Sequence, residues 1–187
     1  MDVHFRKIGA RRYAVHVDRE LAPAVAASPA PGYDDYLPHD LLHFVAEAEW
    51  GLDGAVFGQL AAGGDPGIFL PIEHSLVREW VRRRKVRPKA HPKGRRSELL
   101  AHALECAWNA RHRRRHLPEY WEDIVASARV DSERFDRVVA SLDELAARWH
   151  GLSIGEDLTL RWPRQEGRRA RSARRKGERR SRRVQRS

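Results

Sequence analysis

Four side chains that can bind a metal ion or move a proton lie close together in the stretch "LPHDLLHFVAEAE" (residues 37–49). They are His39, Asp40, His43 and Glu47. On a helix, positions 39, 43 and 47 are separated by four residues each, so their side chains lie about one turn apart on one face. Two imidazoles and a carboxylate suit zinc, or Fe²⁺ and Mn²⁺ where coordination positions stay open. The sequence therefore predicts a metal site at His39, His43 and Glu47.

Metal-assisted hydrolysis is the simplest reaction that such a site would support, with Asp40 or Glu49 as the residue that carries the proton. Zinc proteases share the His-x3-His spacing and place a glutamate beside the first histidine. Here that neighbour is Asp40, whose shorter side chain reaches a metal-bound water less well, which weakens a protease interpretation. Asp34 and Asp35, which precede the stretch, offer further oxygen ligands.

The tetrad His39-Asp40-x-x-His43 is similar to the zinc motif of a ubiquinone-biosynthesis family, in which H-D-x-x-H is followed by eleven residues and a glutamate. The resemblance implies zinc binding by the two histidines. The position of the final glutamate falls on Ala55 in this chain, so the fourth element of that motif is missing unless Glu47 or Glu49 replaces it. The longer stretch 33–64 resembles a family of uncharacterised bacterial proteins, which implies no activity.

A second interpretation makes the same residues an ordinary solvated face of a helix. The apolar side chains of this helix form a stripe roughly opposite the histidines: Leu41, Leu42, Val45, Ala48 and Leu52. Asp40 near the helix start could act as its N-cap, which would place His39 outside the helix. Against this interpretation, Trp50 falls on the same side as the histidines and indicates that another element covers that side.

The elements around this helix indicate an α+β fold. Strands are expected over 3–7 and 12–18, joined as a hairpin, and over 157–162, where apolar and polar residues alternate. The last strand is expected to pair with the N-terminal hairpin in a small antiparallel sheet. About five helices should pack on it, over about 39–50, 74–85, 97–113, 118–128 and 131–150, with Gly51 ending the first and Asp131 or Ser132 capping the last.

The segments between these elements are expected to be irregular. Residues 19–37 are rich in proline, alanine, glycine and aspartate, and residues 86–96 hold two prolines and a glycine, so both read as loops. One or two helical turns are expected around 55–62. The apolar run 68–72 is either a brief strand or a segment that fills the core. Cys106 lies among apolar residues and is expected to be a buried packing residue.

The net charge of +10 is concentrated at the C-terminal end. Residues 163–187 carry 12 Arg and Lys against 2 Asp and Glu, which accounts for the whole excess, and they contain almost no apolar side chains. We therefore expect one domain over 1–162 and a disordered arginine-rich tail. The segment 78–96 adds ten basic groups against one acidic group. Both segments could bind nucleic acid through its phosphates, with an affinity that falls as salt rises.

The composition excludes some classes of protein and leaves others open. No apolar run approaches the roughly 18–20 residues that span a bilayer, and a single cysteine allows no intrachain disulfide framework. The cytoplasm is the expected compartment, with no membrane partner. Three functions remain open: a protein with a metal site, a nucleic-acid-associated binding protein, and a scaffold or interaction module without a catalytic site.

Overall fold

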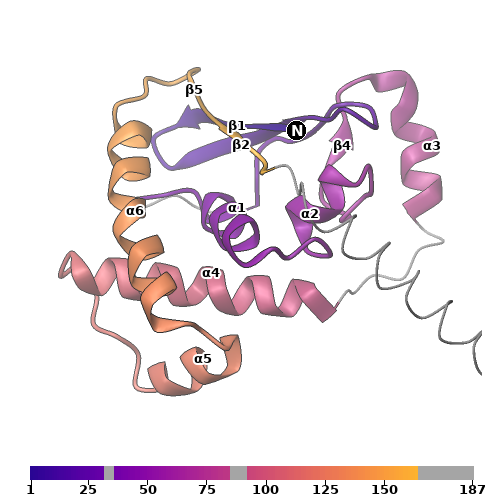
Figure 1. The fold of residues 1–187 in the computed structure, drawn as a ribbon. Coiled ribbons are helices and arrows are strands. Elements are labelled where there is room, and N and C mark those ends of the chain that lie inside the picture. The colour runs from indigo at the N-terminus through magenta and orange to yellow at the C-terminus, as the bar shows by residue number, and fades with distance from the viewer. Residues whose placement is uncertain (32–35, 85–91, 164–187) are drawn as a thin grey trace, which may run out of the picture.

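The computed structural model describes residues 1–31, 36–84 and 92–163. Within these ranges it contains five strands and six helices, so the α+β prediction is confirmed (Figure 1). Asp34, Asp35, residues 85–91 of the basic segment and residues 164–187 of the tail lie outside the described residues. No helix in the described ranges is both long enough and apolar enough to cross a membrane.

The sheet is antiparallel throughout and has the strand order β4-β3-β2-β1-β5. Its strands are β1 (Asp2–Gly9), β2 (Arg12–Asp18), β3 (Val25–Ala27), β4 (Leu70–Pro71) and β5 (Asp157–Arg161). The predicted hairpin is β1–β2, and β5 pairs with β1 in the register Val3 opposite Leu160 and Phe5 opposite Leu158. The prediction that the two ends of the domain meet in one sheet is confirmed.

Two short strands extend the sheet where irregular structure was expected. β3 lies inside the segment 19–37 that was expected to be a loop, and its Val25 and Ala27 are buried. β4 lies in the apolar run 68–72, which resolves the two alternatives for that run in favour of a strand. Strands of two or three residues are too short to show an alternating pattern in the sequence. Their positions come from pairing in the sheet, β3 with β2 and β4 with β3.

The six helices are α1 (His39–Trp50), α2 (Val56–Ala61), α3 (His74–Arg84), α4 (Pro92–Arg111), α5 (Trp121–Ala128) and α6 (Ser132–His150). Of the two residues predicted to cap α6, Asp131 is the cap, because its carboxylate accepts a hydrogen bond from the Arg134 backbone N–H. The prediction of a loop over 86–96 is wrong for its last residues, since α4 already begins at Pro92. Proline suits the first turn of a helix, where its missing N–H costs no hydrogen bond.

Helix α1 lies between the sheet and α4, and this layering positions the candidate site (Figure 1). One side of α1 packs on the sheet, where the rings of Phe44 and Phe5 meet edge to face with centroids 6.1 Å apart. The opposite side packs on α4, which lies below α1 in the view of Figure 1. The start of α4 lies near the middle of α1, since Ser97 hydrogen-bonds to both His43 and Glu47.

Candidate metal centre

Helix α1 begins early enough to include both histidines. Pro38 is its N-cap residue and His39 its first helical residue, so Asp40 is not the cap. The helix ends at Gly51, which has φ of 63° in the left-handed region that glycine adopts without strain. His39 and His43 therefore lie one turn apart, and their Nε2 atoms are 3.1 Å from each other.

The polar side of α1 is not solvated, so the interpretation of these residues as an ordinary solvated helix face is wrong. The exposed fractions of Asp40, His43 and Glu47 are 7%, 5% and 0%. Trp50 is buried as well, with its ring facing that of Phe135 on α6. His43 and Glu47 lie where α4 and α2 cover α1, whereas Asp40 lies against the sheet at Tyr13. In both places each buried polar group needs a partner.

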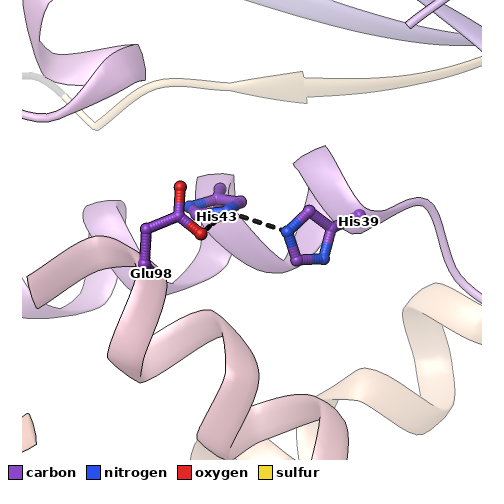
Figure 2. A group of neighbouring side chains, drawn as sticks. All are labelled: His39, His43 and Glu98. Atoms are coloured by element: carbon purple, nitrogen blue, oxygen red, sulfur yellow. Dashed lines mark hydrogen bonds and ion pairs between the residues drawn. The ribbon is translucent and has the colours of Figure 1, made fainter. Parts of the chain in front are cut away.

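The third member of the metal-ligand group is Glu98 of α4. The ligand atoms of His39, His43 and Glu98 all lie within 4.8 Å of one another, and Glu98 Oε2 is 3.4 Å from His43 Nε2 (Figure 2). The two histidines come from α1 and the carboxylate from α4, and the three side chains point toward a common space. The His43 ring is buried whereas the Glu98 side chain is 69% exposed, so the group opens to the surface on the Glu98 side.

Two of the three separations between these ligand atoms match those expected around a single metal ion, and the third is at most 4.8 Å. Two ligands at the usual zinc distance of about 2.0–2.1 Å in a tetrahedral arrangement are roughly 3.3 Å apart. The separations are 3.1 Å between the two histidine Nε2 atoms and 3.4 Å between His43 Nε2 and Glu98 Oε2. Burial lowers the pKa of His43, which favours the neutral imidazole that a metal requires.

Glu47 does not join this group, because its carboxylate is used elsewhere. Oε1 accepts hydrogen bonds from the backbone N–H of Val56 and the hydroxyl of Ser97, and Oε2 accepts from the N–H groups of Phe57 and Gly58. Three of these donors belong to the first turn of α2, so Glu47 acts as its cap from a distance. Burial raises the pKa of Glu47 to about 7, against the effect of these donors. The structure brings Glu98, and not Glu47, to the two histidines.

Ser97 connects Glu47 to the metal-ligand group. Its hydroxyl has one proton, which it donates to Glu47 Oε1 at 2.8 Å. Its oxygen then accepts from His43 Nδ1–H, at 2.7 Å. This fixes His43 as the tautomer whose Nε2 carries the lone pair, and Nε2 is the atom that faces His39 and Glu98. Partners of this kind orient metal-binding histidines in many proteins.

Replacing Ser97 with alanine is expected to weaken zinc binding by roughly 10–100-fold, because His43 loses the acceptor that fixes its tautomer. The measurement is a calorimetric zinc titration of the wild-type chain and of Ser97→Ala. Ser141→Ala is the matched control, since its hydroxyl donates to the Val138 carbonyl within α6. Equal affinities of wild type and Ser97→Ala would show that Ser97 does not position His43.

The two residues proposed as proton carriers lie in different places. Asp40 is beside the group: its Oδ2 accepts a hydrogen bond from the Tyr13 hydroxyl at 2.8 Å, and burial raises its pKa while the nearby histidines oppose that rise. Glu49 is exposed, six residues beyond His43. A helix turns about 100° per residue, which places Glu49 on a different side of α1 from His43. The structure therefore keeps Asp40 near the group and separates Glu49 from it.

No protein-family model, no curated protein and no solved structure matches this chain. The resemblance of His39-Asp40-x-x-His43 to the zinc motif of a ubiquinone-biosynthesis family stays a prediction, as does the resemblance to uncharacterised bacterial proteins. Interpretation of the site therefore depends on its own geometry.

Proposed function

We propose that this protein binds one divalent transition-metal ion, with zinc preferred, through His39, His43 and Glu98. The observation that carries the proposal is the convergence of two imidazole nitrogens and a carboxylate oxygen from two helices. Imidazole with carboxylate is a common donor set for zinc, and two histidines with one carboxylate also suit Fe²⁺. A bound cation would take the place of the proton that now lies between the two Nε2 atoms.

Three protein ligands leave a coordination position open, which supports a catalytic rather than a purely structural role. A metal at such a position lowers the pKa of water and polarises the bond to be broken, so hydrolysis is the reaction we propose. The exposed side of Glu98 gives a substrate access to the group. Asp40 contributes negative charge from the buried side, and we propose that it accepts the proton released when water is activated.

The test compares hydrolysis of activated ester and phosphate-ester probes by the full chain in three states: as zinc-loaded, after removal of metal with a chelator, and after zinc is restored. We expect activity only with zinc. Asp40→Asn should lower the rate and keep zinc bound. Activity that persists at the same rate after metal removal, or that zinc does not restore, would contradict metal-assisted hydrolysis.

Association with nucleic acid through 163–187 and 78–96 is a second proposal. In its described part, the segment 78–96 presents Arg82 and Arg83, whose side chains are 78% and 73% exposed although both pair with Glu79. We expect binding to single-stranded DNA that weakens as salt rises and that Arg82→Gln with Arg83→Gln reduces. Binding that is unaffected by salt would count against association with nucleic acid.

A scaffold role without a site is the outcome if neither metal nor nucleic acid binds.

A further inference from the structure

Arg114 is held between two aromatic rings just beyond the end of α4. Its guanidinium carbon lies 4.0 Å from the centroid of the Tyr36 ring and 4.3 Å from the centroid of the Trp108 ring. The backbone N–H of Arg114 donates to the Asn109 carbonyl, and Trp108 Nε1–H donates to Asp143 at 2.9 Å. The backbone of Arg114 is therefore held at the end of α4, and the guanidinium lies against an anchored ring.

Among the described residues, no carboxylate pairs with the guanidinium of Arg114, although its neighbours have such partners; Asp34 and Asp35, just before Tyr36, lie outside the described residues. Arg111 and His112 both pair with Asp143, and Arg115 lies 4.0 Å from Glu105. In the part of the chain that the structure describes, Arg114 Nη1 is buried and has no hydrogen-bond partner. Stacking covers the two faces of a guanidinium, whereas its N–H donors point outward in the plane between the rings. A group that enters edge-on would therefore meet the donors of Arg114 other than the buried Nη1.

The residue before Arg114 brings a second guanidinium to this end of α4. Arg113 and His116 are exposed, and Arg113 adopts φ of 54° where the chain leaves α4. A planar fork of donors with a second cation on the preceding residue suits a doubly charged phosphate better than a single carboxylate.

The two rings that hold Arg114 connect it to the two helices that carry the metal-ligand group. Tyr36 precedes His39 by only three residues, and a chain of that length spans about 10 Å at most. Trp108 belongs to α4, the helix that carries Glu98. Arg114 therefore lies at the end of α1 where His39 begins the helix.

We propose that Arg114, clamped by Tyr36 and Trp108, binds the phosphate group of a small ligand. Binding of phosphate itself does not require the metal. The identification of this ligand as the substrate rests on the proposed function, for which it names phosphate esters as the substrate class.

The test uses inorganic phosphate and the metal-free full chain, with the indole N–H signals recorded by nuclear magnetic resonance. Arg114→Gln and Arg113→Gln remove the same charge at adjacent positions, so a comparison between them separates a built site from general attraction to a basic protein. We expect a saturable shift of the Trp108 indole signal in the wild type and in Arg113→Gln. In Arg114→Gln the affinity should fall by about 10-fold or more.

Equal phosphate affinities of Arg114→Gln and Arg113→Gln would overturn the inference, as would the absence of a saturable shift in the wild type. If Arg114→Gln does not fold, Arg114→Lys decides the matter, because it keeps the charge and loses the planar fork. Weaker binding by Arg114→Lys supports the site, and unchanged binding contradicts it. A zinc titration of Arg114→Gln separates this inference from the proposed function, since zinc affinity should stay within about twofold of the wild type.

Discussion

Replacing Glu98 with glutamine is expected to weaken zinc binding by more than about 100-fold, since loss of a ligand should exceed the roughly 10–100-fold cost of losing an outer partner. The carboxamide keeps the size of the side chain and removes the charge that holds the cation. Because the Glu98 side chain is 69% exposed, the substitution should leave the fold intact. Calorimetric titration of the metal-free full chain measures the effect.

Glu105→Gln is the matched control for this experiment. Glu105 lies on the same helix, two turns after Glu98, and its carboxylate pairs with Arg115. We expect its zinc affinity to equal that of the wild type. Equal weakening by both substitutions would mean that zinc responds to the general charge of α4, and no effect of Glu98→Gln would remove Glu98 from the site.

Replacing Glu47 with alanine is expected to lower the free energy of unfolding by about 3 kcal/mol at neutral pH. The substitution leaves the buried N–H groups at the start of α2 and the Ser97 hydroxyl without their acceptor. It also leaves a cavity where a fully buried side chain was. Burial raises the pKa of Glu47, which means that burying the charged carboxylate itself opposes folding. The expected loss of stability is therefore smaller than the sum of four charge-assisted hydrogen bonds.

Urea denaturation of the metal-free chain measures this loss. Glu49→Ala, two residues further on the same helix and exposed, should change the stability by less than about 0.5 kcal/mol. Glu47→Gln, which fills the same volume and keeps one acceptor oxygen, should lose less than Glu47→Ala. A loss of less than about 1 kcal/mol in Glu47→Ala would contradict the capping role assigned to Glu47.

Local sequence rules predicted the elements that depend on local interactions. The bounds of α1, its end at Gly51 and the Asp131 cap of α6 follow from propensity, glycine conformation and capping, and all three are confirmed. The pairing of β5 with β1 was also predictable, because both strands alternate and the chain between them can return to the hairpin. Strands β3 and β4 could not be predicted, because they are too short to show an alternation of apolar and polar residues.

Only the ligands that lie on the same helix could be predicted from the sequence. His39 and His43 share a turn of α1, so their spacing indicates their proximity. Glu98 lies 55 residues after His43 and reaches it only because α4 packs on α1. No pattern near Glu98 marks it as a ligand.

The role of Glu47 was missed for a related reason. Spacing places it one turn beyond His43, but the chain that follows Gly51 folds back and brings the first turn of α2 to its carboxylate. Gly58 permits that approach, since a Cβ at this position would lie 2.4 Å from Cα of Asp53. A close backbone contact of this kind depends on the tertiary fold and leaves no periodic signal in the sequence.

The central claim is that His39, His43 and Glu98 bind one metal ion. The most direct test measures the metal content of the full chain. The chain is purified without a histidine tag, incubated with Zn²⁺, Mn²⁺ or Fe²⁺, and then dialysed. The account predicts about one zinc ion per wild-type chain and almost none in His39→Ala or Glu98→Gln. A wild-type chain that retains none of the three metals would contradict it, and so would equal metal content in the wild type and both variants.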